Sequence, residues 1–322
     1  MLDLPNKTSF DPSNLDRFAD WVELACLLDD QLSREDVSDL PSDLFLLGER
    51  SRGQIRRGDS FDDEVMTSLA DERGRFTDDL WGILRMRSRL LGKGYPFSVT
   101  ANTVSLRTAQ WRQSLCFTSL LIADLGRFYQ KVHLDLGEDS EFSLLFEKIV
   151  QAALLAKLGG TTVRFGFPYD ADMRGTIAQR VQRLAQHFGG EVAARPRLRG
   201  NDKDMGLDVA SRWSFGDDGH GTVCLLTQCA AGKGWKRKTG EPSLARWRAI
   251  LDWQSTLIRA VAVPWRFEKP EYDYPRYAEH FDAIVLDRMR LCGADLEPSL
   301  DVSVRANLDG WCSERIGELP SV

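Results

Sequence analysis

An apolar run that carries one amide constrains the fold of this chain more than any other feature. Residues 222–229 are β-prone and largely apolar up to Gln228, and a loop rich in glycine and lysine follows at 232–238. A short apolar run bounded by turn residues is typical of a strand buried inside a sheet. Because a buried amide must find a hydrogen-bond partner, the end of this strand is predicted to face a polar group.

A second β-prone segment, 206–213, holds a single acidic residue, Asp208, near its start. The two segments are predicted to be neighbouring core strands, which would place Asp208 close to Gln228. Plainer interpretations remain open for both side chains. The carboxylate of Asp208 could satisfy a turn or a strand ladder, and Gln228 could bond a neighbouring loop.

The chain is long enough for one large domain or two, because 322 residues with 43% hydrophobic content can bury a substantial core. Its formal charge of -6 is unevenly distributed. Residues 1–80 carry 20 Asp and Glu against 9 Lys and Arg, a net charge of -11, and residues 195–248 carry 11 Lys and Arg against 6 Asp and Glu, a net charge of +5. A polyanion is therefore expected to bind at 195–248.

Cysteine spacing and hydropathy restrict the class of protein further. The six cysteines are scattered without a CxxC or a Cys/His metal spacing, so they are expected to be reduced and mostly buried. No stretch approaches the roughly 18 apolar residues that span a bilayer, and no leader pattern begins the chain. We expect a cytoplasmic protein that does not enter a membrane.

The N-terminal 135 residues are predicted to form a mainly helical region. The apolar spacing gives helices at 15–30, 61–91 and 109–130, a loop with a short helix at 31–60, and a hairpin from 95–99 and 103–106. The hydrophilic stretch 135–141 is the best candidate boundary. It divides the chain into a region 1–135 and a domain 136–322.

Helices and strands alternate after that boundary, which predicts an α/β (α+β) fold. Helices are expected at 142–154, 177–188, 243–258 and, as a C-terminal tail that could cover the sheet or meet a partner, 275–292; strands are expected at 161–167, 191–195, 206–213, 222–229 and 260–264. With 161–167 and 177–188 set aside as an insertion, the order is helix, three strands, helix, strand.

That order, with an acid on one strand and a polar residue ending the next, resembles the restriction-endonuclease-like, PD-(D/E)xK nuclease superfamily over residues 141–265. The string QCAAGKGW at 228–235 is similar to a bacterial subgroup with Gln-Cys-Ala-(Thr/Ser/Ala)-Gly before a Trp, and Tyr95-Pro96-Phe97 resembles the N-terminal portion of its members. The resemblance implies a core of helix, mixed central sheet and helix.

The resemblance also implies a site for Mg²⁺ or Mn²⁺. Phosphodiester cleavage uses a divalent metal to activate water and to offset charge on the leaving oxygen, and Mg²⁺ prefers oxygen ligands. The carboxylate of Asp208, the side-chain carbonyl of Gln228 and the backbone carbonyl of Cys229 are the expected ligands. Glu147 resembles the extra acid that many members place near the metal, although it could instead face solvent or pair with Lys148 or a nearby arginine.

One expected residue is missing. Members of the superfamily usually carry a lysine two residues after the second polar ligand, and that position is Ala230 here. Lys233 or Lys238 is predicted to supply the cation instead, together with Asp208 and Gln228 as the catalytic set.

Nucleic acid is expected to contact Trp235, Lys236, Arg237, Arg197 and Arg199. The basic residues could equally form a solvated loop, and Trp235 could pack against the 243–258 helix instead of stacking on a base or sugar.

The leading hypothesis is a Mg²⁺-dependent endonuclease that cleaves DNA as the effector of a bacterial anti-phage defence system, with an ATPase or sensor as protein partner. A catalytically inactive nuclease-fold subunit that binds DNA or serves as an adaptor is the alternative, and Ala230 favours it. A third hypothesis is an interaction protein whose acidic N-terminal region mimics DNA or holds a partner. A homo-oligomer is compatible with all three.

Overall fold

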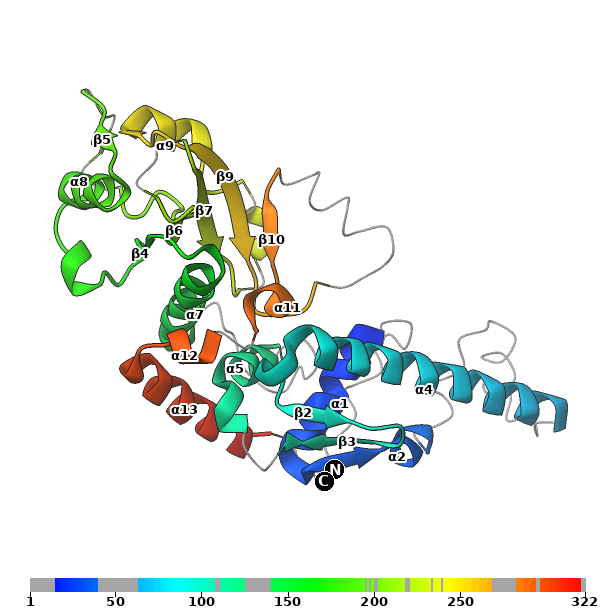
Figure 1. Ribbon diagram of the computed structural model, residues 1–322. Coiled ribbons are helices and arrows are strands. Elements are labelled where there is room, and N and C mark those ends of the chain that lie inside the picture. Colours follow the sequence, from blue (N-terminus) through cyan, green and yellow to red (C-terminus); the bar gives the residue numbers. More distant parts are fainter. Residues whose placement is uncertain are drawn as a thin grey trace.

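The computed structural model describes residues 15–39, 63–107, 111–124, 140–194, 196, 198–199, 202–217, 221–232, 234–238, 240–267, 282–293 and 296–319. These residues form a mixed α/β structure with a mixed central sheet (Figure 1). The fold class predicted from the alternation of helices and strands is confirmed at this level. The boundary predicted at 135–141 lies mostly outside the described residues.

The N-terminal part combines helices with a small antiparallel sheet. Its elements are α1 (Leu15–Asp29), β1 (Gln31–Ser33), α2 (Arg34–Ser38), α4 (Asp63–Leu91), η2 (Gly92–Gly94), β2 (Phe97–Val99), β3 (Thr103–Leu106), η4 (Trp111–Ser114) and α5 (Leu115–Ala123). The predicted hairpin is confirmed, since β2 pairs with β3 antiparallel. The prediction of a loop at 31–33 was wrong, because Leu32 is buried opposite Val104 and adds β1 to the sheet.

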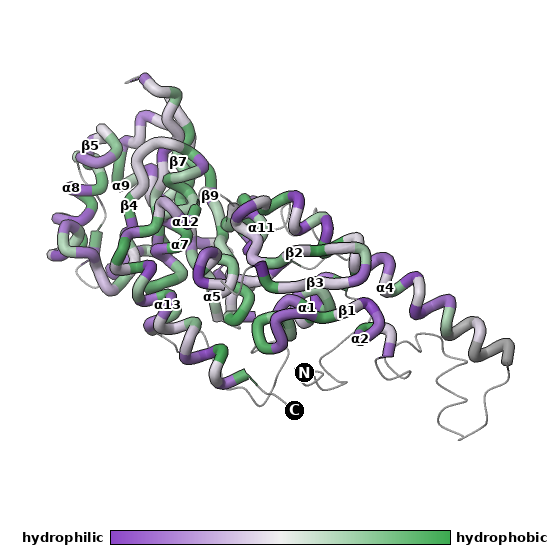
Figure 2. Tube along the Cα trace, turned by 60° about the horizontal axis from the view of Figure 1, so that its bottom comes forward, coloured by the Kyte–Doolittle hydropathy of each residue, from purple (hydrophilic) through white to green (hydrophobic). Residues whose placement is uncertain are grey.

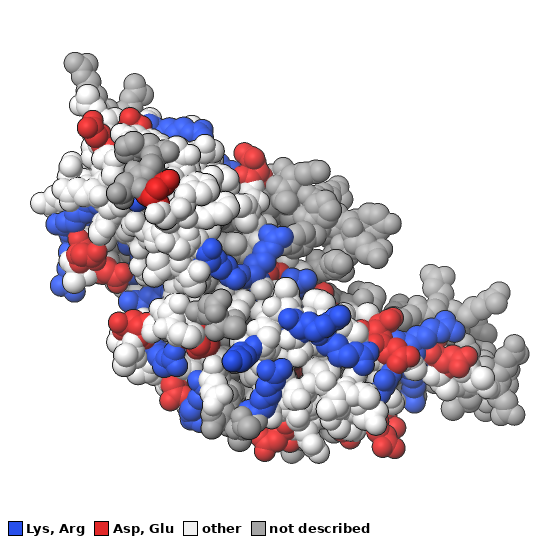
Figure 3. Space-filling model, viewed as in Figure 1, with Lys and Arg blue, Asp and Glu red and all other residues white. Residues whose placement is uncertain are grey.

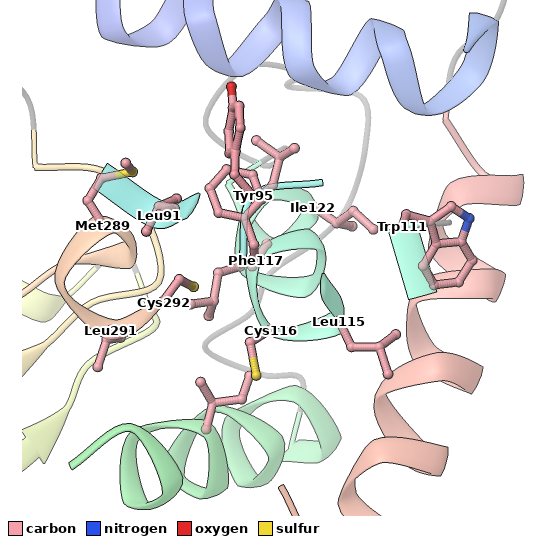
Figure 4. Packing of buried hydrophobic residues seen from close by; sticks show 14 of the residues in the cluster. Leu91, Tyr95, Trp111, Leu115, Cys116, Phe117, Ile122, Met289, Leu291 and Cys292 are labelled. Carbon is pink, nitrogen blue, oxygen red and sulfur yellow. The ribbon is translucent and has the colours of Figure 1, made fainter. Parts of the chain in front are cut away.

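Helix α5 lies at the centre of the largest apolar cluster. Every residue of α5 is buried, so the helix has no solvent face. Figure 4 shows Trp111 beside α13 (Val302–Gly317) and Cys116 directed toward α7 (Ser140–Leu158). The rings of Tyr95 and Phe117 pack edge-to-face, with 5.2 Å between their centroids. The helix predicted at 109–130 begins as the 3-10 turn η4, and its last six residues lie outside the described part.

The central sheet has five strands in the order β10-β9-β7-β6-β4. They are β4 (Thr162–Arg164), β6 (Val209–Arg212), β7 (Val223–Cys229), β9 (Thr256–Ala262) and β10 (Ile284–Leu286). Neighbours from β4 to β7 are antiparallel, and neighbours from β7 to β10 are parallel. Asp208 and Gln228 thus come from adjacent strands, as predicted.

Helices cover both faces of this sheet because its strands alternate between two apolar clusters. Val209 and Leu225 belong to the cluster that contains α7, whereas Ala210 and Leu226 belong to the one that contains α8 (Ile177–Phe188) and α9 (Leu244–Ile250). Successive residues of a strand point to opposite faces. Figure 2 shows the resulting concentration of apolar residues (green) along β7 and β9.

The prediction of which strands form the sheet was partly wrong. The segment set aside as an insertion supplies β4, the edge strand next to β6, where Val163 is buried in the α8 cluster. The segment predicted at 191–195 is instead β5 (Glu191–Val192), which pairs with β8 (Leu251–Asp252) outside the central sheet. Local pattern identifies strands, but pairing depends on contacts between distant segments.

The helix predicted at 243–258 was also too long. It ends at Ile250, and residues from Thr256 form β9. Trp247, Ile250 and Leu257 are buried in one cluster although they belong to a helix and a strand, so their spacing imitated a single helical face. The same correction applies to the 275–292 tail, where 284–286 is β10 rather than helix and α11 (Arg288–Leu291) is short.

The chain ends with α12 (Leu296–Ser299) and α13, which the sequence patterns did not predict. Helix α13 packs on α5 and α7, with Trp311 at 4.7 Å from Phe142 between ring centroids. All six cysteines lie in the described part and are buried and free of disulfides, as predicted. Among the described helices, none is both long and apolar enough to cross a bilayer.

Candidate active site

A pocket of about 360 Å³ opens where β6 begins and β7 ends. Because these strands are antiparallel and Asp208 N donates to Thr227 O at 3.0 Å, the start of one strand lies beside the end of the other. The pocket lining combines carboxylates, an amide, one lysine and aromatic rings: Ser143, Phe146, Glu147, Phe167, Asp204, Asp208, Gln228, Cys229, Ala231, Gly232, Gly234, Trp235, Lys238 and Glu241.

Asp208 is a buried carboxylate held by neutral donors. Its Oδ2 accepts a hydrogen bond of 2.6 Å from the backbone N–H of Cys229 and another from the side-chain amide of Gln228. Within the part of the chain that the structure describes, no lysine or arginine hydrogen-bonds this carboxylate. Burial, reinforced by the nearby charge of Glu147, raises the pKa of Asp208 well above its ordinary value.

Only the nitrogen of the Gln228 side-chain amide is hydrogen-bonded to described residues. Its Nε2 donates to Asp208 and to the backbone carbonyl of Cys229 at 3.1 Å, so the polar partner predicted for this strand end is the neighbouring carboxylate. Its Oε1 is buried and finds no hydrogen-bond partner among the described residues. Because Gln228 also lines the pocket, this oxygen is available to a ligand that brings a hydrogen-bond donor or a cation.

Glu147 projects from α7 into the same pocket. Arg164 of β4 donates to its Oε2 at 2.6 Å, which is the pairing with a nearby arginine that the sequence left open; Lys148 contacts Asp170 instead, at 3.5 Å. Burial outweighs the attraction of Arg164 and raises the pKa of Glu147 to about 7. This carboxyl group therefore exchanges its proton near neutral pH.

The loop after β4 fits closely around these acids. The backbone N–H groups of Phe165 and Gly166 donate to the carbonyl of Asp208 at 2.7 and 3.2 Å. A Cβ atom on Gly166 would lie 2.4 Å from Oε2 of Glu147, so only glycine allows the carboxylate to occupy this place. Arg164 also bonds the carbonyls of Gly166 and Pro168 and the carboxylate of Asp170, which fixes the loop.

Ala230, at the position where the resemblance predicted a lysine, is buried. Ala230 is 1% exposed, and its N–H donates to Ala262 O at 2.9 Å. Of the two lysines predicted to replace it, Lys238 lines the pocket with an exposed side chain, and its charge lowers the pKa of Asp208 against the larger effect of burial. Lys233 lies outside the described residues.

Of the residues predicted to bind nucleic acid, one lines the pocket, and the others lie away from its lining or outside the described part. Trp235, in the 3-10 turn η6 (Trp235–Arg237), lines the pocket and packs edge-on against Trp265 and Phe267 at 5.9 and 5.5 Å between centroids, which differs from the predicted packing on the 243–258 helix. Arg237 is exposed nearby, outside the lining. Arg199 is away from the lining, and Arg197 and the side chain of Lys236 lie outside the described part.

The sequence patterns missed two further carboxylates, Asp204 and Glu241, that line the pocket. Asp204 precedes a turn in which Met205 and Gly206 have φ angles of 57° and 73°, and its Oδ1 accepts from Gly206 N at 2.9 Å. An acid two residues before a glycine could have suggested this turn. Glu241 carries no local signal, because only the fold brings it to the pocket.

The pocket lining supplies oxygen atoms from carboxylates and an amide. No three His, Cys, Asp or Glu side chains among the described residues converge at ligand spacing. The pocket nevertheless combines an orphaned amide oxygen, a buried carboxylate without a cationic partner and three more acids. Oxygen ligands of this kind are those that Mg²⁺ and Mn²⁺ take in proteins.

Comparison with known proteins leaves this geometry as the basis for assigning a function. No protein-family model, no curated protein and no solved structure matches the chain.

Proposed function

We propose that the protein is a Mg²⁺- or Mn²⁺-dependent endonuclease that cleaves DNA. The order α7, β4, β6, β7, α9, β9 supports the proposal, because it is the helix, three strands, helix, strand order of the restriction-endonuclease-like core once β4 replaces the 191–195 segment. Asp208, directly before β6, and Gln228, near the end of β7, are the two polar residues that the resemblance expects on neighbouring strands of such a core.

The single observation that carries the proposal is the pair formed by Asp208 and Gln228. Both residues line the same pocket; the Asp208 carboxylate has no cationic hydrogen-bond partner among the described residues, and Oε1 of Gln228 has no donor there. Burying such groups is costly unless a partner compensates them. One divalent cation would satisfy both at once, whereas a purely structural role would require neither group to reach the pocket.

The residues present fit the roles that cleavage requires. Asp208, Gln228 and Glu147 would hold the cation, which supplies the activation of water and offsets charge on the leaving oxygen. Without the cation, burial raises the pKa of Glu147 to about 7, so this carboxyl group would lose its proton when it binds the metal. Lys238 places a positive charge at the rim, where it stabilises the negative charge that develops on the phosphate.

Surface charge also supports a polyanionic substrate. Figure 3 shows lysine and arginine side chains (blue) gathered in the middle of this face, around the region where β7 and β9 end in Figure 1. A basic patch of this kind attracts phosphates. The acids of the pocket would repel a phosphate unless a divalent cation lay between them.

The alternative is an inactive nuclease-fold subunit that binds DNA or serves as an adaptor. Ala230 favours it, because alanine supplies no cation at the position where the resemblance expects a lysine. The described chain offers Lys238 as the replacement, and this is why we prefer the enzyme. The defence role, the ATPase or sensor partner, the cytoplasmic location and a homo-oligomeric state belong to the same proposal and follow from the resemblance; an adjacent ATPase or methyltransferase gene would support them.

The test is Asp208→Asn in the full chain. We expect the wild type to bind Mn²⁺ in calorimetry and to nick supercoiled plasmid DNA with Mg²⁺, and the variant to lose both while keeping its circular dichroism spectrum. Asp79→Asn, an exposed position on α4, is the matched control. Full cleavage by Asp208→Asn would rule out this site. Retained DNA binding without metal binding or cleavage in the wild type would establish the adaptor.

A further inference from the structure

Phe167 is an exposed aromatic ring at the mouth of the candidate active site. It is 64% exposed and lines the pocket beside Asp208 and Trp235. Exposed apolar side chains are common on protein surfaces, but Phe167 differs from exposed rings such as Phe215 because it lines the pocket, where a bound ligand would contact it.

Hydrogen bonds from its own backbone and from Arg164 hold the loop that carries Phe167. The two residues before it donate backbone hydrogen bonds to Asp208 O, and Arg164 bonds the carbonyls on either side of it, those of Gly166 and Pro168. The ring of Phe167 meets Tyr169 edge-to-face at 5.2 Å, and the guanidinium of Arg180 lies 3.8 Å from the Tyr169 ring centroid. A fixed ring binds with little loss of conformational freedom.

A second aromatic ring lines the same pocket from another part of the chain. Trp235 precedes Lys238 by three residues and is supported from behind by Trp265 and Phe267. The pocket therefore combines two supported aromatic rings, a lysine at its rim and acids at its base. Its volume of about 360 Å³ is within the range of sites that enclose a small organic group.

We infer that Phe167 and Trp235 form a stacking platform for an unpaired base, and that the substrate is therefore a single-stranded nucleic acid or a single-stranded segment within a duplex. The inference rests on the proposed function and specifies its substrate. Aromatic rings stack on any base, whereas in a duplex the base faces are already covered by their neighbours. Lys238 would contact the adjacent phosphate while the acids hold the cation.

The experiment measures binding, so that it does not depend on cleavage. Fluorescence anisotropy with a labelled oligothymidylate and with a labelled duplex of equal length, in Ca²⁺ and separately in EDTA, gives the affinity of the full chain for each. We expect tighter binding of the single strand, and a loss of about 5- to 150-fold for Phe167→Ala on that strand, which corresponds to one stacked base. Affinity for the duplex should change little.

Two further variants separate stacking from other effects. Phe167→Tyr keeps the aromatic face and should bind like the wild type, and Phe167→Leu keeps an apolar side chain without that face and should bind like Phe167→Ala. Phe215→Ala is the matched control, because Phe215 is 65% exposed and contacts one aromatic ring, Trp213, away from the pocket lining. Equal losses for Phe167→Ala and Phe215→Ala, or no loss at all, would overturn the inference.

Failure of the stacking platform can be distinguished from failure of the nuclease proposal. If the wild type does not cleave but single-strand binding still depends on Phe167, the platform stands and the nuclease assignment fails. If it cleaves duplex DNA and Phe167→Ala cleaves and binds it equally well, the nuclease stands and the platform fails.

Discussion

The backbone N–H of Cys229 donates a 2.6 Å hydrogen bond to Oδ2 of Asp208, across the antiparallel pair β6 and β7. The bond fixes the carboxylate at the end of the strand that carries Gln228. Neutral donors orient Asp208 without neutralising it, and burial keeps the pKa of its carboxyl well above the ordinary value. Ionisation of Asp208 is therefore unfavourable unless a cation compensates its charge, as the proposed function requires.

Lys238→Ala should slow cleavage at least about 100-fold, the effect of removing one electrostatic stabiliser of the transition state. Lys238 lines the pocket, and the buried Ala230 stands where the proposed resemblance expects a lysine. Single-turnover rates on plasmid DNA give the comparison, with Lys238→Arg expected to retain part of the rate and Lys93→Ala, exposed on η2, as control. Unchanged rates for Lys238→Ala, Lys233→Ala and Lys236→Ala would favour the adaptor.

Metal binding should release protons and strengthen as the pH rises from 6 to 8. Burial raises the pKa of Glu147 to about 7 and that of Asp208 above its ordinary value, so both carboxyl groups must lose protons to hold a cation. Calorimetry with Mn²⁺ in two buffers of different ionisation enthalpy measures the protons released. Glu147→Gln should release fewer protons than the wild type; equal release would contradict a role for Glu147.

The raised pKa of Glu147 also predicts how the free energy of unfolding changes with pH. Since the folded-state pKa of Glu147 is about 7 and its ordinary value is 4.5, the folded protein binds more protons than the unfolded chain between these values. The free energy of unfolding should therefore fall as the pH rises through this window without metal, and the stability present below pH 4.5 is lost above 7. Urea titrations at pH 5 and 8 should show a smaller loss for Glu147→Gln.

Much of the candidate site could be predicted from local sequence, because its central residues adjoin strand ends. Asp208, Gln228 and Cys229 lie on adjacent strands whose β-prone composition is readable without the fold. Glu147 came from resemblance. Glu241 and Phe167 could not be predicted, since nothing local marks them and only tertiary structure brings them to the pocket.

The fold was predictable where one element buries one regular face. The hairpin of β2 and β3 and helix α8, with its capping box at Thr176 and left-handed Gly189 at its end, follow from local rules. The errors arose where two elements share one core, as at Trp247 and Leu257, or where a long-range partner decides the pairing, as for β4 and β10. The spacing of apolar residues does not show where one element ends and another begins in a shared core, and it does not show which strands pair.

Gly166→Ala should lower the cleavage rate and destabilise the protein by about 1–3 kcal/mol, the usual cost of overpacking. The added Cβ would lie 2.4 Å from Oε2 of Glu147 and 2.8 Å from its carboxyl carbon, so the carboxylate must move. In a Glu147→Ala background the same change should cost much less, which a double-mutant cycle in urea measures. Gly82→Ala, an exposed site on α4 with open space around it, should be neutral or stabilising.

Arg87→Met should lower the free energy of unfolding by about 3–5 kcal/mol, more than Gly166→Ala or Asp309→Ala. Arg87 of α4 is fully buried and donates to Asp20 Oδ1 at 2.6 Å, to Glu23 Oε1 at 2.9 Å and to Asp16 Oδ1 at 3.0 Å, all on α1. Its removal leaves these acids buried with less compensation. Asp309→Ala, which breaks a surface pair with Arg112, should cost only about 0–1 kcal/mol.

The buried ionic cluster also joins distant parts of the chain. Arg288 of α11, which follows β10, bonds the same Oδ1 of Asp20 that Arg87 contacts. Because the two arginines share an acceptor, the costs of Arg87→Met and Arg288→Met, measured in urea, should not add. Each single variant should still unfold in one transition that near-ultraviolet and far-ultraviolet circular dichroism follow alike. Additive costs, or separate transitions for the two signals, would show that α1 and α11 are held together by contacts other than this cluster.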